Sequence, residues 1–96
     1  MADYNGWSNY ETWNVALWLD NEQGSYDEAR DMARRARSEH DLAGQLKDWV
    51  HEMAPDLGAS MFADLLGAAL SEVDWYEIAE HYYEETHQDE EEEAEA

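Results

Sequence analysis

The 96-residue chain carries 25 acidic and five basic side chains, a formal net charge of −20, and 12% of its residues are aromatic. Direct binding of nucleic acid through its phosphates is disfavoured, because that contact needs clustered lysine and arginine. The absence of cysteine excludes disulfides and thiolate metal sites.

The composition also indicates the class of protein and its compartment. The aromatic content is too high for an ordinary acidic disordered chain, and the length suits one domain with a single modest core. No apolar run approaches the roughly 20 residues of a membrane span, and no charged-then-apolar signal sequence opens the chain. We therefore expect a soluble, cytoplasmic domain with no membrane partner.

The first predicted helix lies within residues 8–20. Ser8 and Glu11 have the spacing of a capping box, and Asn9 is a competing N-cap. At about 100° per residue its apolar side chains leave no continuous polar face, unlike those of an amphipathic surface helix. They are Tyr10, Trp13, Val15, Ala16, Leu17, Trp18 and Leu19. A helix of this kind is usually surrounded by others, so we expect it at the centre of a small bundle.

The second predicted helix follows Gly24, which suits a left-handed turn, and runs to about Glu39. Ser25 and Glu28 repeat the capping-box spacing. The apolar stripe is narrow and consists mostly of small residues: Tyr26, Ala29, Met32, Ala33 and Ala36. This helix should therefore pack closely against a neighbour.

Charged residues are ordered along the second helix. Acidic residues fill its first turns and arginines its last, which complements the helix dipole at both ends. Asp27 and Arg30 also have the spacing of an ion pair. We therefore interpret the arginines as internal neutralisation rather than as an anion site.

Two further helices follow. Asp41 is the predicted cap of a third helix, whose apolar residues recur at i, i+4, i+7, i+8 and i+11 through residues 42–53. Ala54-Pro55 ends it, because the residue before proline avoids the α region. A fourth helix is predicted over residues 57–70. Its small residues, Gly58, Ala59, Gly67 and Ala68, suggest close contacts with other helices.

The fifth predicted helix covers about residues 73–86, with Ser71 and Asp74 at its start. Its periodicity predicts a buried stripe of Val73, Tyr76, Ala79 and Tyr83, with Trp75, Ile78 and Tyr82 alongside, and leaves Glu72, Glu77, Glu80, Glu84 and Glu85 outside. Residues 88–96 form a like-charge block that repels itself and is predicted to be disordered. No strand-like alternation and no internal repeat are evident. The sequence thus predicts an all-α fold, a compact bundle of four to five short helices in residues 1–87 with the first helix central. A disordered acidic tail follows at 88–96.

Catalytic and metal-binding signatures are sparse. No Gly-rich phosphate loop, nucleophile elbow or His-Glu-x-x-His motif occurs. Glu84-x-x-His87 matches the ligand spacing of di-iron bundles, and Asp48-x-x-His51 resembles it. Such a site also needs inward-facing carboxylates on two more helices, and chance matches are frequent in so acidic a chain. We expect no enzyme activity, no catalytic residue, no metal and no cofactor.

The charge gives the most direct hypothesis on function. A compact chain of this length has a long dimension of roughly 35 Å, and duplex DNA carries about twenty phosphate charges over that length. The net charge of −20 is of the same order. A rigid acidic bundle would then present carboxylates where a nucleic-acid-binding protein expects phosphates. Adaptation to high salt explains the same charge, so charge alone leaves both hypotheses open.

Three segments carry a resemblance to a known group of proteins: residues 8–22, with Asn9-Tyr-Glu-Thr-Trp13, and residues 46–55 and 70–81. They are similar to small uncharacterised proteins of phages, plasmids and other mobile elements, including haloarchaeal ones. The resemblance covers most of residues 7–85. It implies mobile-element cargo, where small acidic proteins often counter host defence, and it supplies no site residues.

We accordingly expect a non-enzymatic acidic binding protein, a DNA mimic that blocks a host defence protein or another basic, nucleic-acid-binding protein. The alternative is a halophile-adapted helical interaction or regulatory domain whose acidity serves solubility. The carboxylates expected to bind the partner are Asp20, Glu22, Glu72, Glu77, Glu80 and Glu84.

Overall fold

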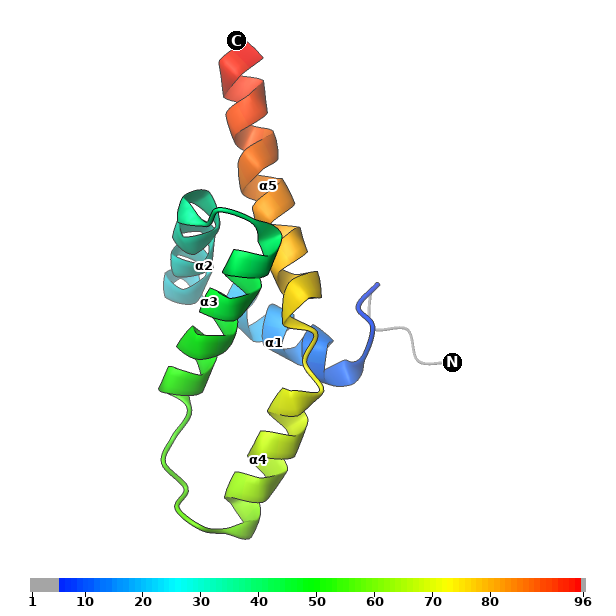
Figure 1. The fold of residues 1–96 in the computed structure, drawn as a ribbon, viewed down its shortest axis with the longest axis vertical. Coiled ribbons are helices and arrows are strands. Elements are labelled where there is room, and N and C mark those ends of the chain that lie inside the picture. Colours follow the sequence, from blue (N-terminus) through cyan, green and yellow to red (C-terminus); the bar gives the residue numbers. More distant parts are fainter. Residues whose placement is uncertain (1–5, 96) are drawn as a thin grey trace.

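Five α-helices and no strand make up the described chain (Figure 1). The computed structural model describes the backbone of residues 6–95 and the side chains of residues 6–87. The helices are α1 (Tyr10–Asn21), α2 (Gln23–Arg35), α3 (Glu39–Met53), α4 (Met61–Ser71) and α5 (Trp75–Glu95). The predicted all-α class and the predicted number of helices are confirmed.

α5 makes the most extensive packing in the bundle. It lies against α3, α2 and α1, which Figure 1 shows around its first half. Its buried side chains recur along one face of the helix: Trp75, Ile78, Ala79, Tyr82 and Thr86. This one-sided apolar stripe is the pattern of a helix that packs through a single face.

The prediction that the first helix is central was wrong. α1 packs against α2 and α5 and buries only Thr12, Ala16 and Leu19, while Trp18 remains 63% exposed. It faces α3 and α4 across hollows of about 230 Å³ and about 180 Å³. A helix with apolar side chains on all sides also has no pattern that specifies which of its faces packs. The tryptophans and tyrosines of α1 tolerate half-exposed positions because each carries a polar atom.

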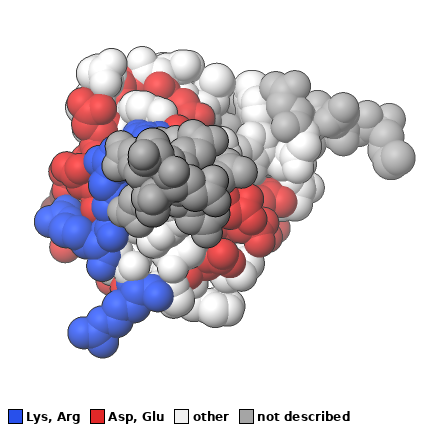
Figure 2. Space-filling view, turned by 90° about the horizontal axis from the view of Figure 1, so that it is seen from above, with Lys and Arg blue, Asp and Glu red and all other residues white. Residues whose placement is uncertain are grey.

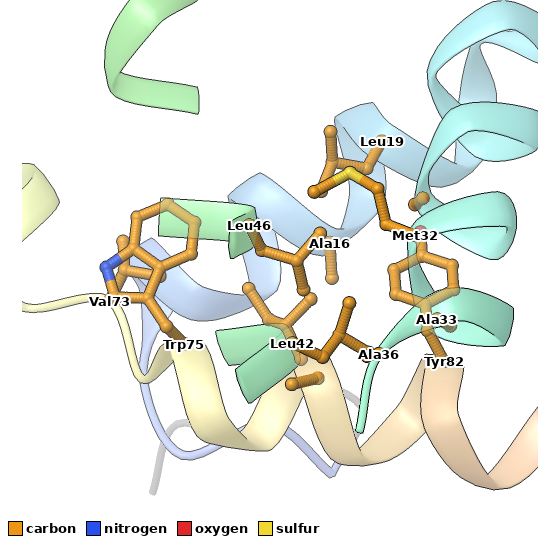
Figure 3. Close-up of a cluster of buried hydrophobic side chains, with 13 residues drawn as sticks. Ala16, Leu19, Met32, Ala33, Ala36, Leu42, Leu46, Val73, Trp75 and Tyr82 are labelled. Atoms are coloured by element: carbon orange, nitrogen blue, oxygen red, sulfur yellow. The ribbon is translucent and has the colours of Figure 1, made fainter. Parts of the chain in front are cut away.

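The core lies between α2, α3 and α5, whose buried side chains converge in Figure 3. Leu42 and Leu46 of α3 and Tyr82 of α5 are fully buried. α2 contributes Met32 and three small residues, Ala29, Ala33 and Ala36. The small side chains let the backbones of the helices approach closely, as the narrow stripe of this helix predicts. Each buried leucine stabilises the fold by about 1.5–3 kcal/mol.

Side-chain caps define where three helices begin. Asn9, Ser38 and Ser60 each accept a hydrogen bond from the backbone N–H three residues further along, at the starts of α1, α3 and α4. The competing cap Asn9 therefore takes the place of Ser8. Asp41, the predicted cap of the third helix, lies inside α3, and its carboxylate accepts from the N–H of Arg37.

The glycine prediction at the second helix was also wrong. Gly24 lies inside α2, and the positive φ angles among the described glycines are those of Gly6 and Gly58. At Gly58, where φ is 62°, the chain turns between α3 and α4, and its N–H donates to Asp56 Oδ1. α2 ends at Arg35 because Ala36 is extended, with φ −70° and ψ 145°.

The N-terminal motif holds the turn between α4 and α5. Asn9 Nδ2 donates to the carbonyl oxygen of Glu72 at 2.7 Å. Thr12 Oγ1 accepts from the backbone N–H of Asp74 at 2.8 Å, and this threonine is fully buried. Asp74 in turn caps α5, since its Oδ1 accepts from the N–H of Glu77. The motif of residues 9–13 thus joins the start of α1 to the turn between α4 and α5 through structural contacts.

α4 departs most from expectation. None of its residues is buried, and its small residues Gly67 and Ala68 are exposed instead of packed against another helix. Leu66 and Leu70 are half-buried on the side that faces α1. The prediction that this helix packs closely against other helices was therefore wrong, because no other helix covers its outer side.

The C-terminal helix begins two residues later than predicted and is helical in its backbone to Glu95. The predicted disordered tail at 88–96 lies outside the residues whose side chains are described. Among the described helices, none combines the length and apolarity needed to cross a bilayer.

Candidate protein-interaction surface

Three of the predicted carboxylates share the outer face of α5. At about 100° per residue, Glu77, Glu80 and Glu84 lie within roughly 60° of one another, opposite the buried stripe. Glu80 and Glu84 are exposed and Glu77 is half-buried. The outside positions of Glu80 and Glu84 are as predicted, but the predicted buried stripe was partly wrong, since Tyr76 is exposed and Trp75, Ile78 and Tyr82 are buried instead.

Two residues from outside the predicted set extend this face. Tyr76, one turn before Glu80, donates its hydroxyl hydrogen to Oε2 of Glu39 on α3, with an O–O distance of 2.6 Å. The ring of His40 lies over the tyrosine, with centroids 4.6 Å apart. We call Glu39, Tyr76, Glu80 and Glu84 the acidic stripe.

The electrostatic potential at the acidic stripe is negative. The hydrogen bond to Glu39 raises the pKa of Tyr76, and the charges of Glu39, Glu80 and Glu84 raise it further. Within the described residues, neither Glu80 nor Glu84 forms an ion pair, and neither makes a side-chain hydrogen bond. These two carboxylates are therefore available to a cationic partner.

Asp20 and Glu77 have partners inside the fold. Asp20 accepts a hydrogen bond from the hydroxyl of Tyr82, which is fully buried. Burial, followed by this hydrogen bond, raises the pKa of Tyr82. Glu77 Oε1 accepts from the backbone N–H of Ser8 at 2.9 Å and so fixes the N-terminal segment on α5. Both carboxylates therefore have structural roles.

Glu22 and Glu72 lie elsewhere on the surface. Glu22 is the residue before α2 and lines a hollow between α1 and α3. Glu72 follows α4 as its C-cap, and its carbonyl oxygen accepts from Asn9. Both side chains are exposed. Of the six predicted carboxylates, the structure therefore brings together Glu77, Glu80 and Glu84.

Residues 1–95 match a protein family that is described only as a family of unknown function. The chain belongs to the family DUF7249. No curated protein and no solved structure matches it. Membership of DUF7249 agrees with a resemblance to an uncharacterised family, and it assigns no activity.

An ion-pair network in this DUF7249 chain was not foreseen. Arg30 of α2 pairs with Glu85 of α5, and Tyr26 donates its hydroxyl hydrogen to the same carboxylate at 2.7 Å. His81 Nε2 lies 3.7 Å from the other oxygen of Glu85. The sequence predicts Asp27 as the partner of Arg30. The packing of α2 on α5 supplies Glu85 instead, a residue 55 positions away.

The arginines at the end of α2 form a separate basic cluster. Arg34 pairs with Asp31 at 3.0 Å, and Arg35 Nε donates to the carbonyl oxygen of Asp31 at 3.2 Å. Figure 2 shows the basic side chains gathered on one side of the DUF7249 molecule, with acidic side chains beside them, and an acidic patch on the opposite side that contains no basic residue in this view. The basic residues are thus confined to one side, while acidic residues lie on both.

The two histidine motifs do not assemble a metal site within the described residues. No group of three or more histidine and carboxylate side chains there is arranged to hold an ion. The ring of His87 lies on Tyr83 with centroids 3.8 Å apart, and that of His51 is 6.2 Å from Trp75. Both histidines pack against aromatic rings.

Proposed function

We propose that this DUF7249 chain is a non-enzymatic acidic binding protein whose acidic stripe binds a basic, nucleic-acid-binding protein in place of DNA. The observation that carries the proposal is the pair Glu80 and Glu84. Both are exposed on the outer face of α5, and neither pairs with a cation among the described residues.

The spacing of charge along α5 supports mimicry of phosphates. The 21-residue helix contains ten acidic residues in its sequence, and its axis is about 31 Å long. Six of the ten lie at residues 89–95. The mean axial spacing is roughly 3 Å, close to the roughly 3.4 Å of helix axis per phosphate of one DNA strand. A basic cleft that follows a DNA strand would meet a similar density of negative charge.

The proposed setting is a mobile genetic element, in which the chain blocks a host defence or DNA-processing protein. Exposed carboxylates of one sign would speed the encounter with a basic partner at low salt. The contact would weaken as salt screens the charges, since the Debye length falls from about 10 Å at 0.1 M to about 3 Å at 1 M.

The test begins with capture of partners from a host lysate on the immobilised chain at low and at high salt. Support requires that a basic nucleic-acid-binding protein is retained only at low salt and is released by added DNA. Retention of no such protein, or retention that DNA does not compete, would contradict the proposal.

The acidic stripe is then tested by charge reversal. Glu80→Lys with Glu84→Lys should weaken binding of the captured protein by about tenfold or more, because two like charges replace two attractive ones. The matched control is Glu28→Lys with Glu52→Lys, which changes the net charge equally at two exposed positions on α2 and α3. Equal losses in both pairs would indicate net charge alone, and no loss in either would refute a role for the stripe. Circular dichroism checks that each variant remains helical.

Thermal unfolding against salt separates this function from salt adaptation. A domain whose acidity serves a saline environment should lose its structure at low salt, because self-repulsion destabilises a compact state of high net charge. A mimic must remain folded at low salt, where it binds. Loss of helix at about 0.1 M salt would therefore favour the halophile-adapted interaction domain.

A further inference from the structure

An apolar helix lies unpartnered at one end of the molecule. Met61, Phe62 and Leu65 of α4 expose 65%, 62% and 62% of their surface. They lie within about 100° of arc. Met61 and Leu65 turn away from the half-buried Leu70, and Phe62 lies about 40° from the half-buried Leu66. α4 thus turns an apolar side to solvent.

Further apolar side chains are exposed toward the same end of the molecule. Trp18 and Met53 line the same hollow of about 230 Å³ between α1 and α3. A second hollow, of about 180 Å³, lies between α1 and α4 and is lined by Tyr10, Leu66 and Leu70. Figure 1 shows the end of α3, the connecting loop and the start of α4 at the same end of the molecule. We call Trp18, Met53, Leu57, Met61, Phe62 and Leu65 the apolar face.

The apolar face is large for a protein that stays monomeric. Its six side chains are between 37% and 65% exposed. Aromatic side chains bury roughly 150–250 Å² each when covered, and leucine and methionine somewhat less, so the six side chains together expose on the order of 600 Å². The largest apolar patch on a typical monomer is roughly 300–600 Å² and is often functional, so the face is at the upper end of that range. A standard interface takes roughly 800 Å² from each partner, and the apolar face would supply most of that area.

The distribution of charge selects the partner. Residues 57–71 contain one charged side chain, Asp64, in a chain that has 25 acidic and five basic residues. A basic protein would be drawn to the acidic stripe rather than to this uncharged end. An anionic membrane surface would repel a chain with a net charge of −20. A second copy of the chain meets the fewest like charges on the α4 side of this face, where Asp64 is the one charged residue, while Glu22 lies at the edge of the hollow that Trp18 and Met53 line.

We propose that the chain forms a homodimer with two-fold symmetry through the apolar face. In an isologous contact each copy presents the same patch, so α4 of one copy packs against the apolar face of the other. Apolar burial drives the contact, while repulsion between two chains of net charge −20 opposes it. Added salt screens that repulsion, so dimerisation should strengthen from about 0.1 M to about 1 M NaCl.

Sedimentation equilibrium of the purified chain tests the assembly at both salt concentrations. The expected mass rises with protein and salt concentration toward twice the 11.2 kDa of one chain. Phe62→Glu and Leu65→Glu, made separately, should each raise the dimer dissociation constant by about tenfold or more, because the buried charge appears twice. Both side chains are largely exposed in the single chain, so the helical circular dichroism should persist.

The matched control is Gly44→Glu on the exposed outer side of α3, where an added side chain meets no atom within 4 Å. It adds the same charge and should leave the dimer unchanged. The proposal is overturned if the wild-type chain stays monomeric at about 1 M NaCl, or if the control and the α4 variants behave alike.

Cross-linking provides an independent readout, since the chain contains no cysteine. Leu65→Cys chains should form covalent dimers with a short bismaleimide, and Gly44→Cys chains should not. Equal yields from both variants would contradict the two-fold contact. Flotation of a monomeric wild-type chain with neutral phosphatidylcholine vesicles would instead assign the apolar face to lipid and would also overturn the proposal.

Discussion

Thr12 is a buried hydroxyl that joins the start of α1 to the start of α5. Its Oγ1 accepts from the backbone N–H of Asp74 at 2.8 Å, across 62 positions of sequence. Valine has nearly the same shape but cannot accept, so Thr12→Val leaves that N–H without its partner. An unsatisfied buried donor costs about 1–3 kcal/mol. The Asp74 contact is only partly buried, and water can partly replace the hydroxyl, so we expect a loss of about 1–2 kcal/mol.

The loss is measured by urea unfolding followed through tryptophan fluorescence and circular dichroism. For a domain of this length, each kcal/mol lowers Tm by about 4–8 °C, so Thr12→Val should melt roughly 4–16 °C lower. The m-value should stay constant, because the substitution does not change the surface exposed on unfolding.

Thr86→Val is the matched control. Thr86 is as deeply buried as Thr12, but its Oγ1 donates to the carbonyl oxygens of Tyr82 and Tyr83 in its own helix. Those carbonyls keep their helical partners, so the free energy of unfolding should change by less than about 0.5 kcal/mol. Equal losses at the two threonines would refute the reasoning, since burial rather than the stranded N–H would then explain both.

Three further predictions follow from the packing. Arg30→Met should lower the free energy of unfolding by about 1–3 kcal/mol, since Arg30 is only 14% exposed in its pair with Glu85; Arg34→Met, from an exposed pair, should cost less than about 1 kcal/mol in the same denaturation assay. Ile78→Ala should cost about 2–5 kcal/mol because the side chain is fully buried, whereas Met61→Ala should change monomer stability by less than about 0.5 kcal/mol. The pKa values of Tyr26, Tyr76 and Tyr82 are raised in the fold, so the neutral phenols contribute stability that is complete below the unfolded pKa of about 10 and is lost as the pH rises above it. Tyrosine absorbance near 295 nm should then show Tyr26 and Tyr76 ionising above the ordinary phenol pKa, and the fully buried Tyr82 ionising as the helical signal falls; ionisation of all tyrosines before the helical signal falls would contradict this.

Local patterns in the sequence predict the helices because each pattern depends on the neighbours in its own segment. The stripe of α2 identifies the face that packs. Glu80 and Glu84 are predicted correctly to lie outside α5, opposite Ile78 and Tyr82, but Tyr76, which the periodicity predicts to be buried, is exposed. Local periodicity therefore locates the outward carboxylates of α5 and misplaces part of its buried side.

Contacts between distant segments could not be predicted in this way. Asp20 and Glu77 look like surface carboxylates, and only the fold shows that Tyr82 and Ser8 donate to them. Glu39 joins the acidic stripe because α3 packs on α5 and brings it to Tyr76, 37 positions away. Helix periodicity contains no information about such pairs, since it does not specify which helices become neighbours.

The relative burial of the helices was misjudged for a related reason. The apolar residues of α1 and α4 suggest buried helices, yet Trp18 and Phe62 are more than 60% exposed. Hydrophobicity measures how much free energy a side chain gains from burial. The length and position of the partner helices decide how many apolar side chains can be covered. In this chain α5 packs on α2 and α3, and apolar side chains of α1 and α4 are left exposed.

The two surfaces should respond to salt in opposite directions. The acidic stripe attracts a basic partner through charge, so its binding should fall as NaCl rises, while the apolar face should dimerise more strongly as repulsion between copies is screened. Measuring both on the same preparation separates the proposals. If salt acted only by changing the fold, partner binding and dimerisation would rise or fall together. Phe62→Glu would then change both or neither. A dimer that retains Glu80 and Glu84 on each copy would present two acidic stripes and could attach at two sites to a surface coated with the basic partner. Phe62→Glu should therefore weaken capture by such a surface. It should leave one-to-one binding in solution unchanged.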